Sequence, residues 1–128
     1  MWQDEKPQAR LTFGFDKKLK SRKSIDRLFK NGRSLSAFPL SLKYLGISEE
    51  DSYKILVAVP KKLHKRAVDR NKIKRRIREA FRIHFRDYLT SSSGCHLAII
   101  YKSPEIVSFD EIQGKLITLL QRLGKKCD

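Results

Sequence analysis

Hydrophobic positions recur along the first half of the chain with two different periods. Apolar residues fall at helical spacing after Ser21, a plausible N-cap, and Gly32 is a stop signal, so we predict a first helix over 21–31. From residue 38 apolar and polar residues alternate, which predicts half-buried strands over 38–44 and 53–59. A polar turn separates the two strands, and we interpret them as an antiparallel hairpin.

The second half alternates helix and strand. A long helical pattern covers 66–89, and the apolar run 95–101 is typical of a buried strand. Ser108 with Glu111 three residues later forms a capping box that predicts the start of a last helix, and Gly124 lies beyond its apolar face. The order helix, strands, helix, strand, helix indicates an α+β domain with helices packed on a small sheet.

Composition restricts the function. The chain has 128 residues, is 40% hydrophobic, and carries 29 Lys and Arg against 14 Asp and Glu, for a net charge of +15. This is enough apolar material for one core, and the charge requires a polyanionic partner. We expect a loosely ordered segment over 1–18 and one RNA-binding domain over 19–126. A folded nucleic-acid binder is favoured over a membrane-surface protein, a disordered basic tail or a freestanding small-molecule enzyme.

The beginning of the chain has no apolar run of the kind that a signal peptide needs, and no later window has the length of a membrane span. We therefore expect a cytoplasmic protein without a membrane partner. Cys95 and Cys127 could form one disulfide, but cysteines of a cytoplasmic chain usually stay reduced, and we expect that here. No paired Cys or His spacing indicates a metal site.

Charge is concentrated between residues 61 and 86, where 12 Lys or Arg and two acids give +10. On a helix the apolar arc of this segment consists of Ile73, Ile77, Ala80, Phe81, His84 and Tyr88. The adjacent arc consists of Asn71, Lys74, Arg75, Arg78 and Arg82. A charged arc is often only a solvated face, but such a face usually mixes signs, and this arc contains no acid. We interpret it as a phosphate-binding face.

Catalytic chemistry has little support in the sequence. His64, His84 and His96 lie on separate elements, and no Ser/His/Asp set, Cys/His set or glycine-rich phosphate loop is recognisable. His84 is expected to pack in the core, whereas His64, just before the basic helix, is placed to touch RNA. The missing cluster of metal ligands disfavours a stand-alone metal nuclease.

The basic segment resembles the signature of the bacterial ribonuclease P protein component. That pattern has Lys-Lys, then Ala-x-x-Arg-Asn-Arg-Ile-Lys-Arg-x-x-Arg-Glu-x-Phe-Arg, and this chain matches it closely over 61–82 with Lys72 in place of an Arg. Lys keeps the charge at this position but lacks the planar guanidinium fork. The resemblance extends more weakly over 19–123.

The resemblance implies a small two-layer α+β domain of order αβββαβα with a left-handed crossover helix, like the second domain of small-subunit ribosomal protein five. It places an additional short strand near 33–35. It also implies an accessory protein without catalytic residues, whose partner, a catalytic RNA, cleaves the 5′ leader from precursor tRNA. Mg²⁺ would be held mainly by the RNA, with none bound by the protein alone.

Site residues follow from the same resemblance. The residues expected to contact the catalytic RNA are Lys61, Lys62, Arg66, Arg70, Asn71, Lys72, Lys74, Arg75, Arg78 and Arg82. By helical projection Arg70 points towards the apolar arc. It lies at the N-terminal end of the helix, where this arc can open to solvent or RNA. The residues expected in a leader-binding cleft between the first helix and the sheet are Phe29, Phe38, Lys43 and Tyr44.

Two alternatives stay open. Aromatic faces stack on unpaired bases, but Phe29 and Leu42 are equally compatible with core packing. Relatives tend to have an aromatic residue where this chain has Lys43, so leader contact there is either electrostatic or shifts to Tyr44. At the level of function, the alternative is a noncatalytic module, similar to a ribosomal protein, that docks on structured RNA.

Overall fold

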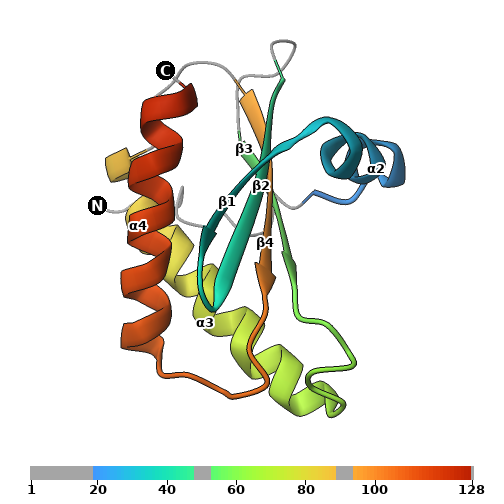
Figure 1. Ribbon diagram of the computed structural model, residues 1–128, viewed down its shortest axis with the longest axis vertical. Helices are drawn as coiled ribbons and strands as arrows, with labels where there is room; N and C mark the ends of the chain where they lie inside the picture. The colour runs from blue at the N-terminus through green and yellow to red at the C-terminus, as the bar shows by residue number, and fades with distance from the viewer. Residues whose placement is uncertain (1–18, 48–52, 89–93, 128) are drawn as a thin grey trace, which may run out of the picture.

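In the residues that the structure describes, the chain forms three helices and one four-stranded sheet. A computed structural model describes residues 19–47, 53–88 and 94–127, so the predicted segment 1–18 lies outside the described residues. The elements in chain order are α2 (Arg22–Asn31), β1 (Arg33–Ala37), β2 (Leu40–Ile47), β3 (Tyr53–Ala58), α3 (Ala67–Tyr88), β4 (Gly94–Tyr101) and α4 (Phe109–Cys127). Helices α3 and α4 cover one face of the sheet, and α2 packs against part of the other face (Figure 1). The α+β class and the order αβββαβα are as predicted.

The strand order is β1-β2-β4-β3, with β3 parallel to β4 and the other neighbours antiparallel. The predicted hairpin of 38–44 and 53–59 is therefore wrong, because β4 lies between β2 and β3. The hairpin is instead β1 with β2, and Phe38 and Pro39 form its turn rather than the start of a strand. Strand β4 takes a central position because nearly all its residues are buried, on both faces of the sheet.

The helix boundaries depend on their caps. The Ser21 side chain accepts a hydrogen bond from the Ser24 backbone N–H at 3.4 Å, and α2 ends at Gly32 as predicted. Ser108 Oγ likewise accepts from the Glu111 N–H at 3.2 Å, just before α4 begins. The predicted end at Gly124 is wrong, since α4 continues to Cys127. A glycine ends a helix readily when it adopts a positive φ, and no glycine in the described ranges does so.

The main core lies between the sheet and the pair α3 and α4. The four predicted core residues Ile73, Ile77, Ala80 and Phe81 are fully buried there. His84 is half-buried, with Nε2 2.8 Å from the side-chain oxygen of Gln113 on α4. The Tyr88 side chain lies outside the described residues. A second, smaller cluster under α2 is made of Leu19, Leu28 and Ala98, with Ile25, Leu45 and Leu56 packed against it.

Candidate nucleic-acid interface

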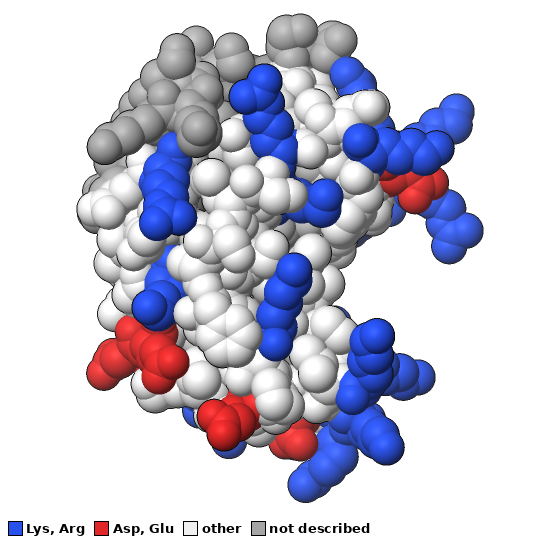
Figure 2. Space-filling model, in the orientation of Figure 1, with Lys and Arg blue, Asp and Glu red and all other residues white. Residues whose placement is uncertain are grey.

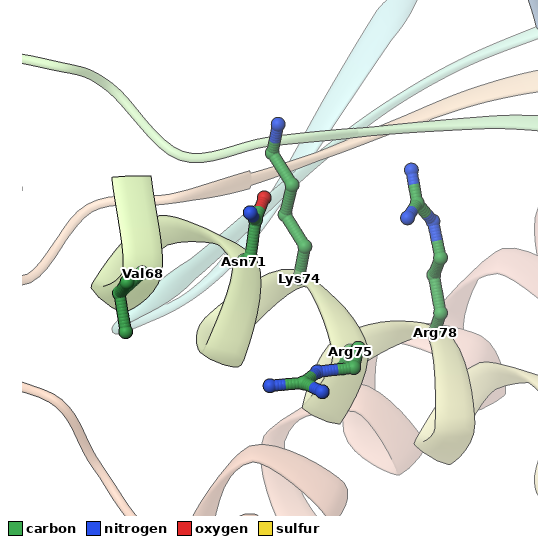
Figure 3. Close-up of a pocket in the computed structure, with 5 residues that line it drawn as sticks. All are labelled: Val68, Asn71, Lys74, Arg75 and Arg78. Atoms are coloured by element: carbon green, nitrogen blue, oxygen red, sulfur yellow. The ribbon is translucent and has the colours of Figure 1, made fainter. Parts of the chain in front are cut away.

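One face of α3 carries the polar stripe that the sequence predicts. The residues that line a shallow hollow of about 420 Å³ on this face are Val68, Asn71, Lys74, Arg75 and Arg78, and we call them the α3 stripe (Figure 3). All five residues come from helix α3. The opposite side of this helix packs in the core, and this packing turns the five side chains outwards. In Figure 3 Lys74 and Arg78 extend in one direction while the Arg75 guanidinium lies across the helix towards Val68. Val68, which the sequence analysis did not select, is 65% exposed and adds an apolar contact to this face.

Two arginines of the basic segment hold the protein's own backbone. The Arg70 guanidinium donates to the carbonyl oxygens of His64 and Lys65 at 2.9 and 2.8 Å, which fixes the turn before α3. Arg76 donates to the carbonyl oxygen of Val107 at 2.6 Å and ties α3 to the segment before α4. Arg70 was predicted to contact RNA, and here its guanidinium is half-buried and engaged in positioning the turn. Hydrogen bonds to carbonyls leave the positive charge in place.

Arg82 differs from the other cations of its predicted arc. Its guanidinium binds the carboxylate of Glu79 one turn earlier, at 2.5 and 3.2 Å. The hydrogen bond from Arg82 lowers the pKa of Glu79, and the same bond raises the pKa of Arg82. Glu79 is therefore ionised at neutral pH and offsets the charge of Arg82. Among the cations of this arc, Arg82 is the one that pairs with an acid in the described residues, and that acid lies beside the arc.

The turn before α3 presents cations to solvent. Lys61, Lys62 and Arg66, which are among the predicted RNA contacts, are exposed. Lys72 is also exposed but lies outside the α3 stripe. His64 is different: it is only 6% exposed, and its Nε2 lies 2.7 Å from the carbonyl oxygen of Ser103. The expectation that it touches RNA is wrong, since the imidazole packs beside the ring of Tyr101 and joins two loops.

The predicted leader cleft corresponds to the face of the sheet that carries α2. Strand register places three rows of side chains on this face. The first row is Ser34, Lys43, Ala98 and Leu56, the second is Ser36, Ser41, Ile100 and Ala58, and the third, under α2, is Leu45, His96 and Lys54. Helix α2 packs against Ala98 and Leu56 of the first row. We call Ser34, Ser36, Lys43, Ile100 and Ala58 the open sheet face, because Ser41 between them is buried at 7% exposed. Figure 2 shows a hollow in the surface beside it, between the cations over α2 and those over the start of α3.

Phe29 and Lys43 meet at the edge of this face. The Lys43 ammonium lies 5.7 Å from the centre of the Phe29 ring, a cation–π contact that joins α2 to β2. Phe29 is 38% exposed, so it is not a core residue, whereas Leu42 is fully buried. The ring of Phe29 and the ammonium of Lys43 thus lie side by side. Lys43 is the position at which relatives are expected to have an aromatic residue.

Tyr44 does not belong to the cleft. It is 7% exposed and packs in the main core, on the opposite side of the sheet from Lys43. Its prediction as a leader contact is wrong, because neighbouring residues of a strand face opposite sides. Phe38 is 67% exposed but lies in the turn between β1 and β2, at the other end of β1 from α2. Of the four predicted cleft residues, the structure brings together only Phe29 and Lys43.

Helix α2 carries further cations that the sequence analysis did not select. Arg22, Lys23, Arg27 and Lys30 are all exposed, and we call them the α2 basic face. Their signal in the sequence is the segment 20–33, which has six Lys or Arg and one acid.

Over 19–47, 53–88 and 94–127, no three His, Cys, Asp or Glu side chains gather closely enough to hold a metal ion. The Cys95 thiol is buried in β4, with Sγ 3.8 Å from the carbonyl oxygen of His96. None of the described helices is long and apolar enough to cross a membrane.

A family model and several curated proteins are similar to this chain. A family model described as Ribonuclease P matches residues 13–124. The ribonuclease P protein component of Porphyromonas gingivalis is 40% identical over 77 residues, but this match covers only 57% of the chain and 56% of that relative. The corresponding protein of Staphylococcus haemolyticus is 31% identical over 105 residues, covering 81% of the chain and 87% of the relative.

Solved structures extend the match to the fold. The RNase P protein of Staphylococcus aureus has a TM-score of 0.72 at 28% identity, with 84% of this chain and 94% of that chain covered. The RNase P protein of Thermotoga maritima has a TM-score of 0.69 at 27% identity, with 82% and 96% covered. Because the family model spans most of the sequence and these relatives match over most of their length, the chain belongs to the ribonuclease P protein family.

Proposed function

We propose that this chain is the protein subunit of a ribonuclease P, in which a catalytic RNA removes the 5′ leader of precursor tRNA. The observation that carries the proposal is the family match over 13–124, which includes the α3 stripe. Within the described ranges Lys74, Arg75 and Arg78 form no ion pair, so their charges are available to phosphates. The protein supplies binding and orientation, and the reacting groups belong to the RNA.

The α3 stripe and the exposed cations Lys61, Lys62 and Arg66 dock on the catalytic RNA in this proposal. Arginine binds a phosphate through two parallel N–H bonds, while lysine acts as a point charge. Each neutralised phosphate releases condensed counterions, which makes the affinity depend strongly on salt. Mg²⁺ is held by the RNA and not by the protein, and the complex works in the cytoplasm.

The open sheet face holds the single-stranded leader. Stacking of an unpaired base on an aromatic ring such as Phe29 contributes about 1–3 kcal/mol. Lys43 beside that ring supplies a phosphate contact in place of a second stacking surface. We expect Phe29→Ala to weaken binding of a precursor with a leader about 5- to 150-fold, which is that energy range converted to affinity, without affecting binding of mature tRNA.

Reconstitution tests the proposal. The protein is mixed with bacterial ribonuclease P RNA at low Mg²⁺, and cleavage of precursor tRNA is measured against the RNA alone. We expect the protein to stimulate cleavage, because its cations reduce the repulsion between two polyanions. Salt-sensitive RNA binding without stimulation would contradict the proposal and leave the alternative of a general module for structured RNA.

A further inference from the structure

Three loops meet at the end of the sheet that lies away from α2 (Figure 1). They are the turn 38–39 between β1 and β2, the segment 102–108 after β4, and the segment 59–66 before α3. The Lys102 N–H donates to the carbonyl oxygen of Pro39 at 2.7 Å, and His64 Nε2 lies 2.7 Å from the carbonyl oxygen of Ser103. These contacts join the three loops side by side, and we call them the loop row.

The loop row combines cations with exposed apolar side chains. Its exposed cations are Lys61, Lys62, Lys65, Arg66 and Lys102, and its exposed acid is Glu105. Three of the five large hydrophobic side chains that are exposed in the described residues lie in the loop row or in the first turn of α3, namely Phe38, Ile106 and Val68. Apolar side chains that gather on a surface mark an interaction site, and the excess of cations selects a polyanion as the partner.

Phe38 is the most exposed of these side chains, at 67%. Turns favour Gly, Pro, Asn, Asp and Ser, so the turn itself does not require an aromatic residue at this position. Pro39 beside it is buried, and the hydrogen bond from Lys102 holds its carbonyl, so the backbone that carries the ring is anchored. An anchored ring loses little conformational freedom when a partner binds. An unpaired nucleotide fits this surface, because its base stacks on an aromatic face while its phosphate binds a nearby cation.

The position of the ring determines which RNA it meets. In the proposed function Lys61, Lys62 and Arg66 dock on the catalytic RNA, and the loop row links these cations to the turn of Phe38. The leader is assigned to the open sheet face beside Phe29, and α2, which carries Phe29, lies at the other end of β1.

We propose that Phe38 stacks on an unpaired base of the catalytic RNA and that Lys102 binds a phosphate of the same RNA. This inference rests on the proposed function and deepens it, since it extends the docking surface from α3 across the loop row. Loops and bulges of a folded RNA supply unpaired bases of this kind.

Binding of the full chain to the catalytic RNA alone, without precursor tRNA, tests the inference. Phe38→Ala should bind about 5- to 150-fold more weakly, the range expected for one lost stacked base, whereas Phe38→Tyr keeps the aromatic face and should bind like the unmodified protein. Stacking releases no counterions, so the salt slope should stay unchanged in Phe38→Ala and fall by about 0.9 in Lys102→Gln. Ile83→Ala, at an exposed apolar position of α3 outside the loop row, is the matched control and should bind normally.

A crosslinking measurement covers the case in which alanine perturbs the turn. A photoreactive phenylalanine analogue in place of Phe38 should crosslink to the catalytic RNA at an unpaired nucleotide. Unchanged affinity of Phe38→Ala would make the ring a solvated side chain and overturn the inference. A loss that appears only with a precursor tRNA that carries a leader, or crosslinks confined to the leader, would overturn it as well. Failure of the proposed function looks different, because the unmodified protein would then bind RNA without stimulating cleavage.

Discussion

Arg75 and Arg82 provide an internal comparison for the phosphate-binding hypothesis, because they are the same residue type on the same helix. Arg75 is exposed on the α3 stripe, and within the described residues it has no acidic partner. Arg82 donates to Glu79 at 2.5 Å, so its charge is already offset. We therefore expect Arg75→Gln to remove a phosphate contact and Arg82→Gln to remove much less.

The magnitude follows from counterion release. One lost contact lowers the slope of log affinity against log salt by about 0.9, which over a fourfold change in salt is a factor of about 3.5. The defect of Arg75→Gln should thus be about 3.5 times larger at 50 mM than at 200 mM salt. The double variant R75Q/R78Q should double the change in slope, to about 1.8.

The assay is a filter-binding or fluorescence titration of catalytic RNA at several salt concentrations, with circular dichroism to verify that each variant keeps its helices. Equal slopes for the unmodified protein and Arg75→Gln would show that the α3 stripe is only solvated. A larger change for Arg82→Gln than for Arg75→Gln would refute the reasoning from ion pairing.

Three further variants test the ion pair of Arg82, the close backbone contact at Gly32 and the packing of Phe81. Glu79→Gln should free Arg82 and steepen the salt slope of RNA binding by up to about 0.9, and an unchanged slope would place Arg82 away from the RNA. Gly32→Ala would bring a Cβ within 2.4 Å of the carbonyl oxygen of Leu28, so we expect a loss of about 1–3 kcal/mol in the free energy of unfolding by urea, and an unchanged midpoint would contradict that geometry. Phe81→Ala, at a fully buried position, should cost about 3–5 kcal/mol in the same measurement, with a loss under 1 kcal/mol arguing against close packing there.

Local patterns in the sequence predict local structure well here. Ser21 and Ser108 mark the starts of two helices because their side chains satisfy backbone N–H groups within the same turn. The order of strands is not local. Alternation along β2 shows which residues share a face, but its central neighbour β4 lies about fifty residues later in the chain, beyond the reach of a pattern within one strand.

The alternation of residues along β2 by itself excludes Tyr44 from the leader cleft. Leu40, Leu42 and Tyr44 have one parity and Lys43 the other, so a single face cannot present both Lys43 and Tyr44. The structure places Tyr44 in the core with the two leucines.

The basic segment shows why residue type does not determine a side chain's role. Arg70 and Arg76 donate to backbone carbonyls, and Arg82 binds a carboxylate, although all three have the charge that suggests RNA binding. A hydrogen bond to a carbonyl keeps the charge but fixes the guanidinium in place, whereas an ion pair also cancels the charge.

The net charge of +10 over 61–86 is therefore larger than the charge that is free to contact phosphates. The free cations of α3 lie on the side of the helix opposite its buried residues. Which arginines are free to contact a phosphate is decided by acceptors elsewhere in the fold, at Val107 and in the turn before α3, that no spacing within the helix reveals. Predicting these roles requires the tertiary neighbours, and the salt slopes of single variants measure them one at a time.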